Sequence, residues 1–283
     1  MEIKAIALDL DGTLLNSERK ISKETKEALI KAQEMGIKVM IASGRSANGL
    51  RPFAEELKLH KYGGLLISNN GAVVQDPHGE VMHLNDTIHI PTMKKLIQHA
   101  SQYDAVIGLM DHDNIYALNA EDAVIDTGNE GLLNVIKGES VDCGLEIIEL
   151  DHFDDFDKPI SKFLVASHLD YMAEHREAII APVKDEISFE YTAPYFIEFM
   201  KKGTNKANGL EAALKVLNIP REHSIAFGDG ENDLSLIQYA GTGVAMDNAT
   251  TNIKEHADLQ THSNDENGIA TFLEEKLFTK NLK

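Results

Sequence analysis

The sequence has little cysteine and little positive charge, and each shortage excludes a class of protein. Its 283 residues contain one cysteine, Cys143, which excludes an internal disulfide framework and any zinc site built on two or more thiolates. A reducing cytoplasm is therefore the expected compartment. Lys and Arg number 27 against 46 Asp and Glu, a net charge of −19. This charge repels phosphate backbones and anionic lipid, so we expect neither nucleic acid nor a membrane surface as a partner.

Long apolar runs are also missing. No stretch approaches the roughly 18 residues that a membrane-spanning helix needs, and the first six residues have neither the basic nor the apolar region of a signal peptide. Hydrophobic residues make up 43% of the chain and charged residues 26%, which is typical of soluble globular proteins. The length suits two domains better than one.

The first part of the chain alternates between short apolar runs and helical patterns. Apolar runs over 4–10, 37–42 and 65–68 have the character of buried strands. A helical pattern between the first two runs starts at a capping Ser22 and stops at Gly36. Strands that alternate with helices predict an α/β fold with a doubly wound, mostly parallel sheet.

The alternation of strand and helix patterns is interrupted after Gly71 and resumes later in the chain. Residues 72–75 and 81–84 flank a strong turn signal and predict a hairpin. Adjacent short strands and helices follow, except in a poorly periodic stretch after residue 118, and they predict an α+β module. The predicted organisation is a Rossmann-like core made of residues 1–82 and 197–283, with an α+β cap domain inserted over 83–196.

Carboxylates gather at the predicted strand ends. Asp9 and Asp11 stand two apart at the end of the first strand, where period two points both side chains the same way. Ligands of parallel sheets bind beyond such ends. Adding Asp229 and Asp233 from a later strand end would increase the repulsion, unless a cation lies among them. All-oxygen ligands favour Mg²⁺. An Asx-type turn at 9–13 and a helix N-cap at 229–233 are the structural alternatives.

A second group of residues favours an anion instead of a cation: Lys206, Ser43 and Gly44. With Thr204 as N-cap, Lys206 falls in a first helical turn, where a cation opposes the helix dipole unless an anion is also held there. The Ser43 hydroxyl and the backbone N–H groups near Gly44 also suit an anion. A solvated lysine and a simple capping serine are the alternatives. Because no P-loop run is present, the pattern predicts a phosphoryl site of another kind.

Four separated motifs carry a resemblance to a known family. They are DLDGT at 9–13, SGR at 43–45 after a strand, KGTNK at 202–206 and GDGEND at 228–233. In this order they resemble the haloacid dehalogenase (HAD) superfamily, most closely its Cof-like phosphatases of subclass IIB. The resemblance covers the whole predicted core, and the position of the insert matches the large cap domain of that subclass.

The resemblance implies a two-step phosphoryl transfer. Asp9 is then the nucleophile that forms an aspartyl-phosphate, and Asp11 is the acid that protonates the leaving oxygen and the base that later activates water. The family pattern also implies ligand sets for the metal and the phosphate. Mg²⁺ is held by Asp9, the backbone carbonyl of Asp11 and Asp229, supported by Asp233, while the phosphate is held by Ser43, Lys206 and Asn232 with backbone N–H groups near Leu10 and Gly44.

The expected function is Mg²⁺-dependent hydrolysis of small phosphorylated metabolites, such as sugar phosphates or phosphorylated cofactors. A phosphomutase or phosphotransferase with the same intermediate, and a non-catalytic protein that binds phosphate esters, remain alternatives. Arg45 is a candidate substrate contact. It could equally link core and cap or be an exposed surface arginine. The oligomeric state is left open by the sequence.

Overall fold

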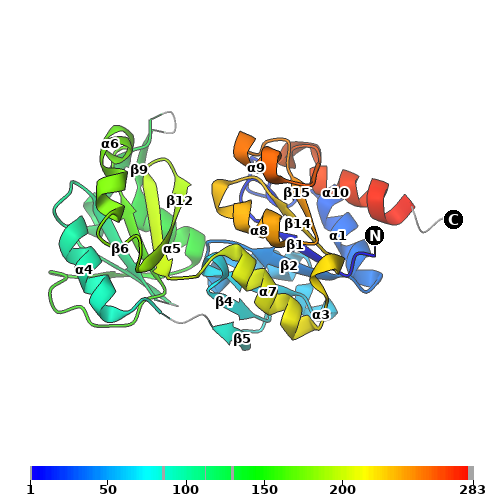
Figure 1. Cartoon of the computed structure of the whole chain (residues 1–283), viewed down its shortest axis with the longest axis horizontal. Coiled ribbons are helices and arrows are strands. Elements are labelled where there is room, and N and C mark those ends of the chain that lie inside the picture. Colours follow the sequence, from blue (N-terminus) through cyan, green and yellow to red (C-terminus); the bar gives the residue numbers. More distant parts are fainter. Residues whose placement is uncertain (1, 85–86, 112, 129–130, 280–283) are drawn as a thin grey trace. The chain divides into compact units, whose positions relative to one another are not determined.

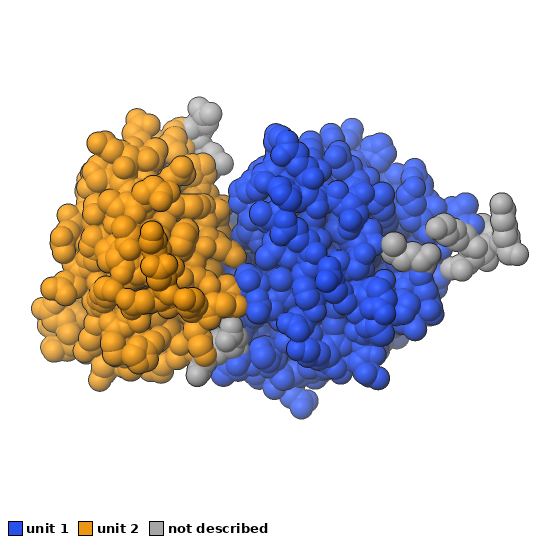
Figure 2. Space-filling view, viewed as in Figure 1, with its two compact units in different colours: residues 1–84, 205–283 blue, residues 85–204 orange. Residues whose placement is uncertain are grey.

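The computed structural model describes residues 2–84, 87–111, 113–128 and 131–279 of the chain. The chain divides into two compact units, which Figure 2 colours separately: unit 1 is Met1–Leu84 with Asn205–Lys283, and unit 2 is Asn85–Thr204. The predicted boundaries, 82/83 and 196/197, fall two and eight residues earlier than these. The boundary at 196/197 cuts into strand β13 (Phe196–Lys201), which is hydrogen-bonded within the sheet of unit 2.

Unit 1 is built on a sheet in the order β16-β15-β14-β1-β2-β3-β4-β5 among its described residues. The strands from β16 to β3 run parallel, and β4 and β5 are antiparallel, as predicted for the hairpin. The mostly parallel core is thus confirmed. The strand bounds are β1 Ala5–Leu8, β2 Lys38–Ala42, β3 Leu65–Ser68, β4 Val73–Gln75, β5 Val81–Leu84, β14 Ser224–Gly228, β15 Thr242–Ala245 and β16 Leu259–Gln260.

Helices cover both faces of this sheet, which makes it doubly wound. On β1, Ile6 and Leu8 pack in one cluster with α1, α2 and α10, whereas Ala5 and Ala7 pack in the cluster of α7 and α8. Alternate residues of one strand therefore bury on opposite faces. The helix bounds are α1 Lys23–Glu34, α2 Ala47–Glu56, α3 Leu59–Tyr62, α7 Lys206–Leu217, α8 Leu234–Tyr239, α9 Thr251–His256 and α10 Gly268–Leu273.

The start of α7 differs from the prediction by one residue. Asn205, and not Thr204, is the N-cap, because Asn205 is extended (φ −161°, ψ 167°) and its Oδ1 accepts the N–H of Asn208 at 3.0 Å. Thr204 instead donates its N–H to Lys201 in the preceding turn. Lys206 becomes the first helical residue, which keeps it in the first turn.

Unit 2 has a mixed sheet in the order β10-β7-β6-β11-β13-β12 and a separate β8-β9 pair within its described residues. Helices α4 and α6 pack on one face of the mixed sheet and α5 on the other. The bounds are β6 Val106–Met110, β7 Asn114–Ala117, β8 Val124–Asp126, β9 Leu132–Asn134, β10 Glu146–Glu149, β11 Lys162–Ala166, β12 Ile187–Ala193, α4 Ile90–Ala100, α5 Val135–Cys143 and α6 Leu169–Ile180. No described helix is both long and apolar enough to cross a bilayer.

Candidate active site

Three neighbouring strands end at one edge of the unit 1 sheet. Strand β1 pairs in parallel with β14 on one side and with β2 on the other, and Figure 1 shows β14 beside β1 although they come from opposite parts of the chain. Asp9 follows β1, Ser43 follows β2 and Asp229 follows β14. The strand order therefore brings the separated sequence motifs to one place, as expected for an open parallel sheet.

Lys206 connects two buried carboxylates there. Its Nζ lies 2.6 Å from Asp9 Oδ1 and 2.6 Å from Asp233 Oδ1. The exposed fractions are 0% for Lys206, 0% for Asp233 and 6% for Asp9. The solvated-lysine alternative is therefore wrong, and a charge-assisted pair of hydrogen bonds fixes the ammonium group at the strand ends.

Asp233 also closes the loop that follows β14. Its Oδ2 accepts the backbone N–H groups of Asp229 and Gly230, each at 3.0 Å. Asp233 stands at the N-cap position of α8, but its carboxylate makes no cap hydrogen bond to that helix. Its bond to the Gly230 N–H is instead the capping contact of the preceding 3₁₀ turn, Glu231–Asp233, so the N-cap alternative accounts for one of its oxygens and not for the one at Lys206. Its two oxygens hold Lys206 on one side and the 229–230 backbone on the other.

Asp229 is held by residues of the first motif and of a later loop. Thr13 donates its hydroxyl to Asp229 Oδ1 at 2.6 Å, and Asn248 Nδ2 lies 2.7 Å from the Gly12 carbonyl and 3.4 Å from Asp229 Oδ2. Sequence reasoning assigned no role to Thr13 or Asn248. Thr13 could have been noticed from its place inside DLDGT, and Asn248 from its place shortly after the apolar run that forms β15.

The carboxylates of the acidic cluster disfavour one another's ionised form. Carboxylate oxygens of Asp9, Asp229 and Asp233 lie within 4.8 Å of one another. Burial raises the pKa of Asp9 well above its usual value, Asp233 and Asp229 add to the rise, and Lys206 opposes it. Burial likewise raises the pKa of Asp229 to about 6, although its hydrogen bond from Thr13 acts the other way. Burial would lower the pKa of Lys206, but Asp233 and Asp9 raise it.

Three carboxylates against one lysine leave a net negative charge in a mostly buried place. An oxygen-only donor set with excess negative charge is the kind that hard divalent cations bind. The Asp9, Asp229 and Asp233 cluster could thus hold a metal ion. Asp233 accepts three hydrogen bonds of 2.6 to 3.0 Å, from Lys206 and from the 229–230 backbone. Asp9 accepts one side-chain bond, from Lys206, and Asp229 accepts a short one from Thr13 and a long one of 3.4 Å. Asp9 and Asp229 therefore have the more available carboxylate oxygens.

Asp11 lies outside this cluster and pairs with Arg45. Arg45 Nε is 2.8 Å from Asp11 Oδ2, and its Nη2 is 2.5 Å from Asp11 Oδ1. The side chain of Arg45 is 11% exposed and that of Asp11 is 52% exposed. The exposed-surface alternative for Arg45 is therefore wrong. Its backbone N–H donates to the hydroxyl of Ser43, which is 3% exposed, at 3.2 Å.

The other predicted phosphate ligands lie on the same loops. Leu10 is buried beside Asp9, and its carbonyl accepts the N–H of Leu15. Gly44 follows Ser43, and Asn232 lies in the short 3₁₀ turn Glu231–Asp233. The structure thus places each of them at the strand edge that carries Asp9, Lys206 and Asp229.

Two glycines allow α7 to bring Lys206 to this edge. A Cβ on Gly209 would lie 2.3 Å from Ile67 Cγ2 and 2.7 Å from Gly71 Cα, and a Cβ on Gly71 would lie 2.2 Å from the Asn205 carbonyl oxygen. The start of α7 therefore packs directly on the turn after β3. Any side chain at these positions would separate helix and turn.

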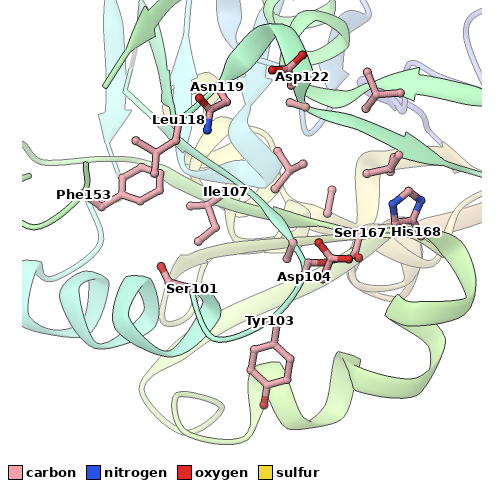
Figure 3. Close-up of a pocket in the computed structure, with 16 residues that line it drawn as sticks. Ser101, Tyr103, Asp104, Ile107, Leu118, Asn119, Asp122, Phe153, Ser167 and His168 are labelled. Carbon is pink, nitrogen blue, oxygen red and sulfur yellow. Dashed lines mark hydrogen bonds between the residues drawn. The ribbon is translucent and has the colours of Figure 1, made fainter. Parts of the chain in front are cut away.

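Unit 2 has its own hollow of about 430 Å³. Figure 3 shows Phe153, Leu118 and Ile107 grouped on one side of it, with Ser167 and His168 on another. None of its lining residues is one of the predicted catalytic, phosphate or metal residues. All of those predicted residues belong to unit 1.

Comparisons with known proteins agree with the fold and the motifs. The sequence profile of haloacid dehalogenase-like hydrolases matches residues 6–273. The chain is 31% identical, over 95% of its length and 96% of the relative, to the 5-amino-6-(5-phospho-D-ribitylamino)uracil phosphatase YitU of Bacillus subtilis.

Solved structures of haloacid dehalogenase-like hydrolases are also similar to this chain. A haloacid dehalogenase-like hydrolase from Bacteroides thetaiotaomicron superposes with a TM-score of 0.82 at 33% identity, covering 97% of this chain and 99% of the other. The HAD subclass IIB sugar phosphatase BT4131 superposes with a TM-score of 0.78 at 25% identity, covering 96% and 98%. The chain belongs to the haloacid dehalogenase-like hydrolase family, in its Cof-like subclass IIB, and is a phosphatase.

Proposed function

We propose that the protein is a Mg²⁺-dependent phosphatase that hydrolyses small phosphorylated metabolites through an aspartyl-phosphate on Asp9. The buried Asp9–Lys206–Asp233 chain, with Asp229 beside it, carries this proposal. It combines a fixed nucleophile, a fixed cation and excess negative charge at one strand edge. Phosphoryl transfer depends chiefly on such positioning and charge stabilisation.

In the first step Asp9 attacks the phosphorus atom in line with the leaving oxygen. Lys206 engages Asp9 Oδ1, so the attacking atom is Oδ2. The new bond from Asp9 Oδ2 to phosphorus forms while the bond from phosphorus to the leaving oxygen breaks, and Asp11 gives its proton to that oxygen. The alcohol then departs.

In the second step water attacks the phosphorus atom of the aspartyl-phosphate. Asp11 removes a proton from that water, the bond between Asp9 and phosphorus breaks, and inorganic phosphate and the free Asp9 carboxylate result. Lys206 and Ser43 hold the phosphate oxygens in both steps, together with Asn232 and the N–H groups near Leu10 and Gly44.

The carboxylates at the site fit Mg²⁺. Asp9, Asp229 and the backbone carbonyl of Asp11 would hold the ion, and Asp233 would support it through its bonds to the 229–230 backbone. When bound, Mg²⁺ supplies positive charge that offsets the approach of an anionic phosphate to an anionic nucleophile. Lys206 contributes the same effect from the protein.

The substrate class is supported by what the relatives act on. One relative is a phosphatase of a phosphorylated ribityl compound and another is a sugar phosphatase. Both names describe phosphatases of sugars or of a ribityl compound. We infer that this chain hydrolyses sugar phosphates or phosphorylated cofactors.

The direct test uses p-nitrophenyl phosphate with Mg²⁺ and with EDTA, for the wild type and for Asp9→Asn. We expect turnover only for the wild type with Mg²⁺, with one phosphate released per nitrophenol. Equal rates with EDTA, or an active Asp9→Asn variant, would refute the proposal. Phosphorylated metabolites ranked by kcat/KM then identify the substrate, and transfer of phosphate to an added sugar would indicate a phosphotransferase instead.

A further inference from the structure

Arg45 forms a bidentate ion pair with Asp11. Two different nitrogens of the guanidinium group meet the two carboxylate oxygens, at 2.8 Å and 2.5 Å. A bidentate pair of this kind fixes the plane of the carboxylate as well as its distance. The sequence offered Arg45 as a substrate contact, whereas the structure directs its guanidinium group to another side chain of the site.

The arginine is the better-anchored member of the pair. Its backbone N–H donates to the Ser43 hydroxyl at 3.2 Å, and its carbonyl accepts the N–H of Asn69 at 2.9 Å. These bonds tie residue 45 to the loops after β2 and β3. Its side chain is 11% exposed against 52% for Asp11. The more buried residue therefore determines where the more exposed carboxylate lies.

Asp11 needs such support more than the other carboxylates do. Asp9 and Asp233 are fixed by Lys206, and Asp229 is fixed by Thr13. Asp11 does not belong to their cluster. In the part of the chain that the structure describes, Arg45 contacts both carboxylate oxygens of Asp11.

We propose that Arg45 is a positioning residue that holds the Asp11 carboxylate for both proton transfers, and that it acts through Asp11 and not through contact with substrate. This inference rests on the proposed function. Each carboxylate oxygen has two lone-pair directions, so an oxygen that accepts from Arg45 still has one for the reacting proton. A misplacement of about 1 Å at a reacting group can cost about 100-fold in rate.

The leaving group distinguishes this role from substrate binding. A sugar alkoxide departs only with a proton, whereas p-nitrophenolate departs without one. Loss of Arg45 should therefore slow formation of the aspartyl-phosphate from a sugar phosphate and not from p-nitrophenyl phosphate. Hydrolysis of the intermediate should be slow from both substrates, because water must still be deprotonated.

The experiment compares Arg45→Met with Arg45→Lys, and with Arg51→Met as a matched control. Arg51 is exposed on α2, in the same part of unit 1. Rapid mixing with p-nitrophenyl phosphate and Mg²⁺ measures the burst of nitrophenol, and steady-state assays measure kcat and KM for glucose 6-phosphate or the best sugar phosphate found.

For Arg45→Met we expect a nitrophenol burst of about one per enzyme at the wild-type rate constant, followed by a slow steady state. We also expect kcat for the sugar phosphate to fall about 10- to 100-fold with KM within about twofold. The kcat of Arg45→Lys should lie between those of the wild type and Arg45→Met, because an ammonium group keeps the charge but not the bidentate geometry. Arg51→Met should match the wild type.

A slower burst together with a slower steady state, or a rise in KM alone, would overturn the inference in favour of direct substrate contact. Arg45→Met kinetics equal to those of Arg51→Met would also overturn it. These results require an active wild type. A wild type without Mg²⁺-dependent turnover, or an active Asp9→Asn variant, would refute the proposed function. Such a result is distinguishable from a failure of the inference about Arg45, because it is seen without any change at Arg45. Comparison of Asp11→Asn with Arg45→Met checks that both variants change the same step.

Discussion

Gly12 lies directly against the carboxylate of Asp229. A Cβ on Gly12 would stand 2.3 Å from Asp229 Oδ2 and 2.8 Å from its Cγ, and Gly12 has a φ of +81°. The glycine in the first motif is therefore needed for space as well as for backbone conformation. Its carbonyl is also the acceptor for Asn248 Nδ2, which connects this contact to the loop after β15.

We predict that Gly12→Ala removes Mg²⁺-dependent turnover. The added methyl group must displace Asp229 or the 9–13 loop, and such a displacement should lower kcat at least about 100-fold. Gly36→Ala is the matched control, because Gly36 has a similar φ of +90° but open space around its Cβ position. It should cost about 1 to 2 kcal/mol of stability and leave kcat unchanged. Equal activity of the two variants would contradict the steric argument.

Lys206→Met should damage both stability and activity. It leaves Asp9 and Asp233 without the cation that lies 2.6 Å from each. Removing one partner of a buried ion pair costs about 3 to 5 kcal/mol, which urea unfolding can measure. Lys215→Met is the control on the same helix, since Lys215 is mostly exposed. A Lys206→Met protein with wild-type stability would show that the two carboxylates find another partner.

Stability without metal should fall as pH rises from about 4 to 7. Asp229 titrates near 3.8 in the unfolded chain, whereas burial raises its pKa to about 6 in the folded protein. Between these values the folded state binds more protons, so the free energy of unfolding decreases with increasing pH. The pKa of Asp9 is also raised, which acts in the same direction.

Thermal unfolding in EDTA across this pH range measures the effect, which should reach up to about 3 kcal/mol for Asp229. The variant Asp229→Asn should show a weaker pH dependence. Mg²⁺ should restore stability at pH 7 in the wild type and much less in Asp229→Asn. A pH dependence that is the same in both proteins would exclude Asp229 as its source.

The contact between α7 and the turn after β3 gives a fourth prediction. A Cβ on Gly209 would collide with Ile67 and Gly71. We expect Gly209→Ala to lower stability by about 1 to 3 kcal/mol and to lower kcat as well, because α7 begins at Lys206. Gly138→Ala on α5 is the control, since its nearest neighbour would be an ordinary 3.7 Å away. That change should be neutral or stabilising by up to about 1 kcal/mol.

Much of unit 1 could be predicted from the sequence because its strands are short, apolar and followed by polar motifs. Strand ends of a parallel sheet meet at one edge, so Asp9 and Asp229 could be placed together although 220 positions separate them. The N-cap of α7 could not be chosen correctly, because Thr204 and Asn205 are both good capping residues. Only the extended backbone of Asn205 decides between them.

The elements between residues 119 and 161 were not predicted. Strands β8 and β9 have three residues each, too few to show a period of two. Helix α5 contains Gly138 and has buried residues concentrated near its two ends, so its periodicity is weak. The Arg45–Asp11 pair was also missed, because a side-chain direction across neighbouring strand ends is not encoded in spacing along the chain.

The order of the motifs along the chain has a consequence for biosynthesis. Unit 1 is completed by Asn205–Lys283, whereas unit 2 is one continuous segment. A ribosome that has delivered β1 to β5 has made Asp9 but neither Lys206 nor β14, which pairs with β1. We expect unit 2 to fold first during translation. Chains that are still incomplete should therefore have no phosphatase activity in the cell.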